Sequence, residues 1–413
     1  MKLWILAWKS LLNRKSTALL TLLAIAVSVA LLMGVEKIRV GAKDNFASTV
    51  SGTDLIVGAR SGSVQLLLYS VFRIGNATNN ISWESYQEIA SFKEIKWTIP
   101  ISLGDSHRGY RVMGTSKDYF EYFRYGSKQK LSLEQGSEFE KPLETVLGAE
   151  VARALNYRLG QKIIVSHGIG TTGIADHDDS PFVITGILKP TGTPVDRTIH
   201  VSLEGIEAMH KNMNRLQSAN SRERIKLNTP TSITAFMVGL DNRMTAFRLQ
   251  RKINNYQSEP LLAIFPGVAL HELWGIMSVA ESALLAVSVL VVVAALVGLL
   301  AVSLAGLGER RREMAVLRSV GAGYRHIAGL LIAESTLLTM IGILTGLVMQ
   351  NLILLLGQGY LISEFGVYLP LEWPSGSEWQ MLFVLLAAGI LVGVVPAYRG
   401  YRNSLLDGLS TRL

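Results

Sequence analysis

Four segments of the chain are long and apolar. Uncharged runs cover residues 16–35, 282–308 and 379–398, and a fourth segment, 327–356, is apolar except for Glu334. A helix needs roughly 20 apolar residues to cross the hydrocarbon core of a membrane. The pattern therefore predicts four transmembrane helices, one near the start of the chain and three near its end.

A different pattern fills the interval between the first two of these helices. Short runs of alternating apolar and polar residues, separated by Gly, Pro and Asn, are typical of strands. The expected strands cover 54–59, 108–114, 161–168, 181–188, 197–203 and 232–240, and the expected helices cover 82–92, 148–157 and 202–213. The predicted fold class is therefore membrane α-helical, with four transmembrane helices and one large extracytoplasmic α+β domain inserted between helices 1 and 2.

These patterns divide the chain into eight parts. They are a cytoplasmic N-terminal segment with transmembrane helix 1 (1–39), the extracytoplasmic α+β domain (40–272), transmembrane helix 2 (273–308), a short cytoplasmic helix (309–325), transmembrane helix 3 (326–356), an extracytoplasmic loop (357–378), transmembrane helix 4 (379–398) and a cytoplasmic tail (399–413).

Charge sets the expected orientation. Both ends of the chain and the loop between helices 2 and 3 are rich in Lys and Arg, whereas the loop between helices 3 and 4 has three glutamates and no basic residue. Basic loops stay on the cytoplasmic side, so both termini are expected in the cytoplasm. The rest of the chain is close to neutral, which argues against nucleic-acid binding. The first apolar segment is longer than a signal-peptide core, which favours a retained anchor over a cleaved signal.

The loop after helix 2 contains the most unusual stretch, GERRREMAVLRSVGA (308–322). Its apolar residues recur on one side of a short helix, and its arginines lie on another. Two hypotheses fit this pattern equally: a helix held on anionic lipid headgroups, and a docking surface for a cytoplasmic partner.

The same stretch resembles the signature of the FtsX/MacB/LolC permease superfamily, the type VII ABC transporters. The order of one helix, a large domain and three helices resembles that superfamily as well. The resemblance implies that this stretch is a coupling helix that sits in a groove of a separate ATPase. The residues given this role are Arg310, Arg311, Arg312, Glu313, Met314, Leu317, Arg318 and Gly321.

Nucleotide chemistry is expected in a partner rather than in this chain. The chain has no Gly-Lys dipeptide and so no phosphate-binding loop of the G-x-x-x-x-G-K-[ST] type. The chain is therefore not expected to be an enzyme or to hold a cofactor, and ATP and Mg are assigned to the ATPase. The other expected partners are a second copy or a paralogous permease, a periplasmic adaptor or substrate-binding protein, and membrane lipids.

The expected function is that of a permease subunit in the bacterial inner membrane. It would couple ATP hydrolysis to motion of its extracytoplasmic domain, for export or extraction of a lipoprotein, peptide, drug, haem or metal complex. One alternative is an FtsX-like signalling scaffold that activates a cell-wall hydrolase without transport. Another is a component of a zinc or other metal transport system.

Polar and small residues inside the apolar segments mark candidate sites. Gly342 and Gly346, and likewise Gly389 and Gly393, form G-x-x-x-G patterns that allow close helix approach, either within one bundle or at a dimer seam. Glu334 is an ionisable residue inside helix 3. Such a residue usually has a partner, and Arg325 or His326 is the expected one, with a role in transport or coupling as the alternative.

Two stretches of the inserted domain leave alternatives open. His167, His177, Asp178 and His200 form a zinc-compatible ligand set, although a solvated acidic turn explains the same composition. Segment 58–82 contains a run of apolar residues that fits either a buried helix or an exposed patch for a partner or lipid. The chain has no cysteine, which excludes disulfides and thiolate metal sites.

Overall fold

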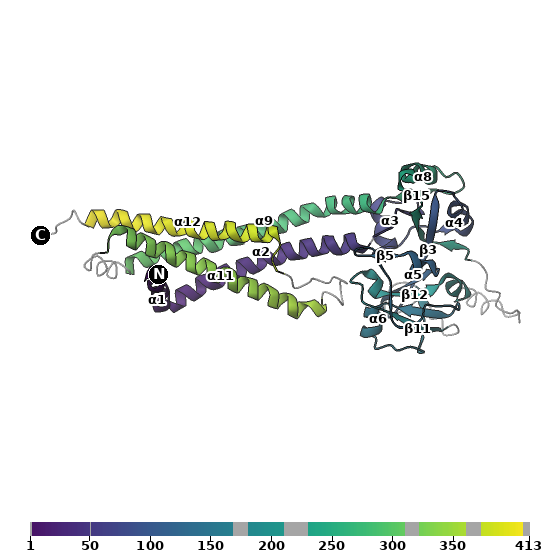
Figure 1. Ribbon diagram of the computed structural model, residues 1–413, viewed down its shortest axis with the longest axis horizontal. Coiled ribbons are helices and arrows are strands. Elements are labelled where there is room, and N and C mark those ends of the chain that lie inside the picture. The colour runs from purple at the N-terminus through teal and green to yellow at the C-terminus, as the bar shows by residue number, and fades with distance from the viewer. Residues whose placement is uncertain are drawn as a thin grey trace. The chain divides into compact units, whose positions relative to one another are not determined.

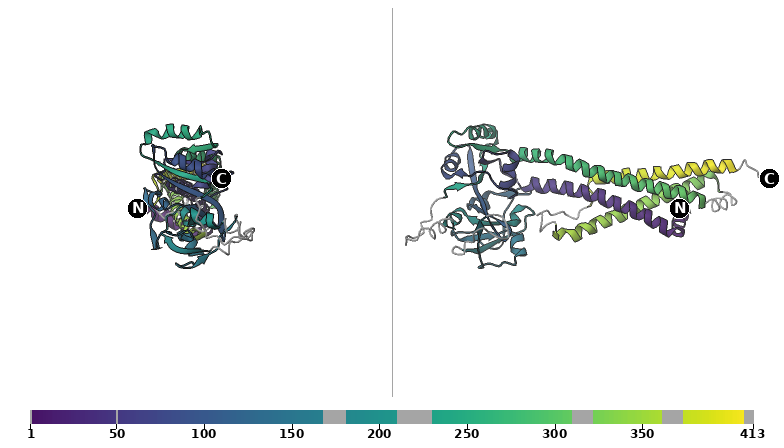
Figure 2. Two further views of the ribbon diagram at one scale, coloured as in Figure 1. Left: turned by 90° about the vertical axis from the view of Figure 1, so that its right-hand side faces the viewer. Right: turned by 180° about the vertical axis from the view of Figure 1, so that it is seen from behind.

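The computed structural model describes residues 2–49, 51–167, 181–209, 230–309, 322–360 and 373–407. Contacts between residues divide the chain into two compact units. The first, the helical unit, comprises Met1–Val40, Ser278–Gly359 and Leu369–Leu413, and the second, the α+β unit, comprises Gly41–Met277 and Tyr360–Tyr368. Long helices dominate the first unit and the strands belong to the second (Figures 1 and 2).

Four long helices run through the helical unit. They are α2 (Lys15–Thr49), α9 (Pro266–Glu309), α11 (Tyr324–Tyr360) and α12 (Gly376–Asp407). Each is long and apolar enough to cross a membrane, and each contains one of the four predicted segments. The predicted fold class, four apolar helices with an α+β domain between the first and second, is therefore confirmed.

Two of these helices are much longer than their apolar cores. Helix α9 has 44 residues and α2 has 35, which corresponds to lengths of about 66 Å and 52 Å at 1.5 Å per residue. The hydrocarbon layer is only about 30 Å thick. Hydropathy alone missed the extensions because the residues beyond the apolar cores are mixed in polarity, and both helices continue into the α+β unit.

A shorter helix, α1 (Lys2–Asn13), precedes the first long helix. Its exposed side chains are largely apolar and include Trp4, Ile5 and Trp8. A short helix that combines exposed Trp and Leu side chains with basic residues is typical of one that lies in a membrane interface. From the sequence, this region is predicted only as an undivided N-terminal segment.

The α+β unit is built on an eleven-stranded mixed sheet. Nine strands follow the order β15-β1-β14-β3-β4-β12-β8-β11-β7, while β10 pairs with β3 and β9 pairs with β11. The strands are β1 (Leu55–Ala59), β3 (Ile95–His107), β4 (Tyr110–Thr115), β7 (Leu133–Gly136), β8 (Glu144–Leu147), β9 (Lys162–Ile163), β10 (Ser166–His167), β11 (Phe182–Leu188), β12 (Thr198–Ser202), β14 (Ala235–Leu240) and β15 (Leu261–Ile264). Two-residue strands form two further small sheets, β2 (Ile81–Ser82) with β13 (Ser232–Ile233), and β5 (Arg124–Tyr125) with β6 (Gln129–Lys130).

The predicted strands lie where β1, β4, β11, β12 and β14 form, and the predicted strand 161–168 is divided into β9 and β10. The longest strand, β3, was missed because Pro100 and Gly104 interrupt its pattern. Proline is usually confined to sheet edges, yet β3 pairs on one side with β14 and on the other with β4. A register shift lies between Leu103 and Ser106, where Gly104 has a φ of +155°.

Short α-helices pack on this sheet, and the buried side chains form three clusters. The described helices are α3 (Ser63–Ser70), α4 (Trp83–Ala90), α5 (Asp118–Tyr122), α6 (Ala149–Ala154) and α8 (Ala246–Asn254). The expected helix 82–92 is α4, whose first turn is capped by Ser82, a side chain that accepts a hydrogen bond from the Ser85 amide. The expected helix 148–157 is α6, and residues 203–209 of the third expected helix are helical.

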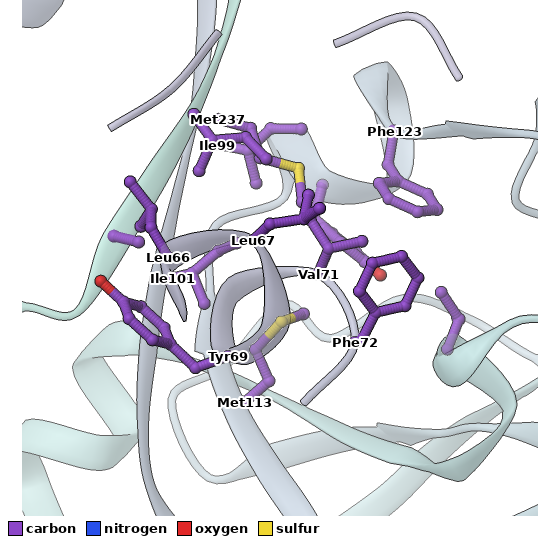
Figure 3. Close-up of a cluster of buried hydrophobic side chains, with 14 of the residues drawn as sticks. Leu66, Leu67, Tyr69, Val71, Phe72, Ile99, Ile101, Met113, Phe123 and Met237 are labelled. Carbon is purple, nitrogen blue, oxygen red and sulfur yellow. The ribbon is translucent and has the colours of Figure 1, made fainter. Parts of the chain in front are cut away.

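The apolar segment 58–82 forms a buried helix, one of the two alternatives. Leu66, Leu67 and Tyr69 of α3 are at most 1% exposed. They pack among core side chains that include Ile99 and Met237 (Figure 3). The run of leucines therefore contributes to the core of the α+β unit.

Candidate functional site

An aromatic junction joins the ends of two long helices to the core of the α+β unit. Phe46 lies near the end of α2, Trp274 lies in the first turns of α9, and Phe72 follows α3. The Phe46 ring centroid is 4.3 Å from that of Phe72 and 5.6 Å from that of Trp274. Ala269 and Leu270 of α9 are buried in the same core cluster as Phe72. Both helices are therefore anchored in the core by large apolar side chains.

The four glycines of the G-x-x-x-G patterns lie against neighbouring helices of the same chain. A Cβ at Gly342 would lie 2.6 Å from Ile25 of α2, and a Cβ at Gly346 would lie 2.7 Å from the Ala26 carbonyl oxygen. On α12, Gly389 faces Thr339 and Gly393 faces Ser335, both on α11. These contacts account for all four glycines by packing within one chain.

Glu334 of α11 is 5% exposed. It lines a small cavity of about 160 Å³ with Arg14, Thr21, Ser303 and other residues. Arg14 also donates a hydrogen bond from Nη1 to the Gly306 carbonyl oxygen at 3.4 Å. The cavity therefore gathers polar groups from α2, α9 and α11 inside the bundle.

The expected bridge from Glu334 to Arg325 or His326 is not favoured by this geometry. Arg325 is nine residues earlier on α11, which places it about 13 Å along the axis and on the opposite side of the helix. Arg325 and His326 are both exposed, and neither lines the cavity that Glu334 lines. Arg14 was not considered from the sequence because it belongs to the turn between α1 and α2, far from Glu334 in the chain.

His200 is a core residue of β12 rather than part of an open site. It is fully buried, and its Nδ1 lies 3.2 Å from the Val146 carbonyl oxygen. Burial, together with the charge of Arg73, lowers the pKa of His200 to about 3. A neighbouring guanidinium repels a cation, so His200 does not suit the expected zinc site.

The remaining metal candidates are only partly described. His167 belongs to β10, while His177 and Asp178 lie outside the described residues. Within the described part of the chain, no group of three or more His, Asp or Glu side chains could hold a metal ion. A zinc site at His167, His177 and Asp178 stays a prediction.

The structure also does not test the predicted coupling residues. Arg310, Arg311, Arg312, Glu313, Met314, Leu317, Arg318 and Gly321 lie outside the described residues. Their role is still an implication of the family resemblance.

Arg73 is a buried charged residue in the α+β unit, and it was not among the sites predicted from the sequence. Its backbone has a φ of 61°, and its Nε and Nη1 atoms are buried with no hydrogen-bond partner among the described residues. Burial lowers the pKa of Arg73, and burial raises the pKa of the adjacent Tyr119 to about 12. Nothing in the sequence around Arg73 signals that its side chain turns inward.

Four apolar helices with an α+β domain between the first and second are the architecture of a multi-pass membrane protein. The comparisons with known families are consistent with this architecture. Residues 18–256 match the MacB-like periplasmic core domain, and residues 285–405 match the FtsX-like permease C-terminal domain. The chain therefore belongs to the FtsX/MacB-type permeases of ABC transporters, and the predicted family is confirmed.

Two solved structures of similar domains share low sequence identity with this chain. The periplasmic region of MacB from Actinobacillus actinomycetemcomitans is 12% identical, with a TM-score of 0.35, over 55% of this chain and 95% of that chain. The extracellular domain of the noncanonic ABC-type transporter YknZ from Gram-positive bacteria is 13% identical, with a TM-score of 0.30, over 51% of this chain and 99% of that chain. No curated protein matches this chain.

Proposed function

We propose that this chain is the permease subunit of an ABC transporter that works by mechanotransmission. A separate cytoplasmic ATPase hydrolyses ATP, and the resulting movement passes along α2 and α9 to the α+β unit, which acts on cargo outside the membrane. The observation that supports this proposal most directly is the aromatic junction of Phe46, Phe72 and Trp274.

The lengths of the two helices suit this role. Both α2 and α9 are continuous helices that begin or end inside the α+β unit and contain an apolar segment long enough to cross a membrane. A continuous helix keeps its hydrogen bonds along its whole length, so displacement of one end moves the other. A flexible linker between membrane and domain would dissipate the same movement.

The aromatic junction would convert helix displacement into domain movement. Large aromatic rings bury much area and pack in preferred orientations, so Phe46 and Trp274 cannot slide past Phe72 without loss of contact. Since well-packed interiors transmit strain, the junction favours movement of the core as a whole over local rearrangement.

The family indicates the partner subunit, and the distribution of basic residues indicates which parts of the chain face it. FtsX-like permeases generally pair with an ABC ATPase, and this chain contains an FtsX-like domain. In the proposed complex, two permease chains and two ATPase subunits assemble with both termini and the 309–325 segment in the cytoplasm. The cargo is a lipoprotein, peptide, drug, haem or metal complex, which is exported or extracted on the extracytoplasmic side of the membrane.

The test is a charge reversal in the segment proposed to dock on the ATPase. The double variant Arg311→Glu and Arg318→Glu is expected to release the ATPase, because a docking surface depends on charge complementarity. The measurement is recovery of the ATPase with the tagged permease from membranes, with hydrolysis blocked. The matched control is Arg248→Glu and Arg251→Glu, which reverses two exposed charges on α8.

We expect at least a tenfold loss of bound ATPase in the first double variant and no change in the control. Equal recovery of the ATPase with both double variants would remove the docking role from the 309–325 segment. Recovery of a cell-wall hydrolase with the wild-type chain, in a complex that moves no cargo, would instead favour the signalling scaffold.

A further inference from the structure

A second cavity in the helical unit has the features of an amphiphile site. It is an open cleft of about 550 Å³ between α2, α11 and the start of α12. Its walls are mostly apolar, with polar side chains among them. The lining residues include Lys37, Leu344, Leu347, Val348, Gln350 and Glu378.

The packing of the helices places the polar residues of the cleft near one level. Gly389 of α12 contacts Thr339 of α11. Glu378 lies eleven residues before Gly389, and Gln350 lies eleven residues after Thr339, so the antiparallel helices bring Glu378 and Gln350 to the same height. Glu378 is near the start of α12 and Gln350 is in the second half of α11, and in the proposed orientation this is the extracytoplasmic half of the membrane.

Lys37 of α2 lies close to the height of Gln350 and Glu378. Gly346 of α11 contacts Ala26 and Val29 of α2, and the two helices run in the same direction at this face. Gln350 is one turn beyond Gly346, and Lys37 is two turns beyond Val29. Lys37 therefore lies near Gln350 or about a turn farther out, whereas Leu344 and Leu347 line the deeper part of the cleft.

Gln350 supplies the observation that points to a ligand. Its side chain is 5% exposed, and its Nε2 is buried with no hydrogen-bond partner among the described residues. An amide donor inside a membrane bundle is costly when it has no acceptor. Because Gln350 lines the cleft, a turn of its side-chain amide would present Nε2 to an oxygen of a molecule bound there.

We infer that the cleft binds one zwitterionic phospholipid of the ethanolamine type from the outer half of the bilayer. An acyl chain lies along Leu344, Leu347 and Val348, and a phosphate or ester oxygen accepts from Gln350. The lipid phosphate lies near the Lys37 ammonium group, and its own ammonium lies near the Glu378 carboxylate.

The charge of the cleft favours a zwitterionic headgroup over an anionic one. Among the described residues that line it, the ionisable ones are Lys37 and Glu378, and a headgroup with one charge of each sign matches both. Glu378 is held in place because its Oε2 accepts a hydrogen bond from the Ser375 amide at 2.6 Å. Trp373, which is 89% exposed, is of the residue type that gathers at the membrane interface.

The experiment measures retained lipid on the full-length protein. The protein is reconstituted with equal amounts of phosphatidylethanolamine and phosphatidylglycerol, extracted in mild detergent and examined by native mass spectrometry. Val348→Trp fills the cleft, and Gln350→Leu removes the donor without filling it. Ile353→Trp is the matched control, since Ile353 is 58% exposed on the same helix and does not line the cleft.

We expect one phosphatidylethanolamine per chain on the wild type and on Ile353→Trp, and at least fivefold less on Val348→Trp and Gln350→Leu. Equal retention on all four proteins, or preferential retention of phosphatidylglycerol, would overturn the inference. A change in oligomeric mass with Val348→Trp, without loss of lipid, would also overturn it and would assign the cleft to a second copy of the chain.

Discussion

The two units of this protein place their large apolar side chains in opposite ways. In the α+β unit, Leu55, Ile56 and Val57 of β1 are fully buried. In the helical unit, Leu356 is 77% exposed and Val384 is 69% exposed. Water drives apolar side chains inward in the first case, whereas lipid is as apolar as the side chains in the second.

The difference explains what holds each unit together. The core of the α+β unit depends on large side chains that fill space between the sheet and its helices. The bundle instead depends on residues with little or no side chain, because Gly342, Gly346, Gly389 and Gly393 allow backbones to approach. The same kind of substitution should therefore have different effects in the two units.

The largest effect is expected from enlarging the small residues of the bundle. In the double variant Gly342→Leu and Gly346→Leu, the new side chains would collide with Ile25 and with the Ala26 carbonyl oxygen. Overpacking costs about 1–3 kcal/mol per site, so we expect a loss of about 3 kcal/mol or more in the free energy of unfolding. The measurement is the apparent melting temperature in detergent.

Gly357→Leu is the matched control for this double variant. Gly357 lies on the same helix, and nothing lies within 4 Å of the position that its Cβ would occupy. It should leave the melting temperature nearly unchanged. Since Leu has a higher helix propensity than Gly, an equal fall for the control and the double variant would show that close packing against α2 does not explain the role of Gly342 and Gly346.

The next effect is expected from shortening a large side chain in the α+β unit. Leu67 is fully buried in the cluster of Figure 3, and Leu→Ala in a core costs about 2–5 kcal/mol. Leu67→Ala should therefore lower the melting temperature clearly, whereas Leu68→Ala, at a half-buried neighbour, should lower it less. The reverse order would mean that α3 does not pack as described.

The smallest effect is expected from the buried histidine. His200 has a pKa of about 3 in the folded protein and about 6.5 when unfolded. Between these values only the unfolded state binds the proton, so stability falls as the pH falls, by at most about 1.4 kcal/mol per pH unit. His200→Asn should reduce the slope of melting temperature against pH between 6.5 and 4.5.

His271→Asn, which replaces an exposed histidine of the same unit, is the control for that slope. The melting temperature of His271→Asn should depend on pH as that of the wild type does. If His200→Asn also keeps the wild-type slope, the ring is not held neutral by burial beside Arg73.

The comparison also shows what the sequence could predict. Hydropathy located all four long helices because roughly 20 uncharged residues in a row leave few alternatives. It could not give their ends, since Phe46 and Trp274 lie beyond the apolar cores, in stretches of mixed polarity. Strand β3 was missed because Pro100 and Gly104 interrupt its alternating pattern, although it pairs with both β14 and β4.

The candidate sites were harder to predict from the sequence than the fold, because they depend on tertiary contacts. The spacing of the glycines signalled close packing but not their partners. Glu334 and Arg14 line one cavity, although more than 300 residues separate them, and no local pattern links them. His200 resembled a ligand because a histidine in a strand gives no sign of whether it faces the core.

The central claim is that ATP hydrolysis in the cytoplasm moves the α+β unit through α2, α9 and the aromatic junction. Since the chain has no cysteine, spin labels can be attached at Met244→Cys in the α+β unit and Leu356→Cys in the helical unit, both exposed. Labelled chains are mixed with excess unlabelled chains and with the ATPase in nanodiscs, so that each complex has one labelled chain.

The measurement is the distribution of distances between the two labels with ATP and after hydrolysis. We predict that the distribution shifts with the nucleotide state in the wild-type background. With Phe46→Ala and Trp274→Ala, the shift should disappear while ATP hydrolysis continues. Identical distributions in every nucleotide state, or a full shift in the Phe46→Ala and Trp274→Ala background, would contradict the claim.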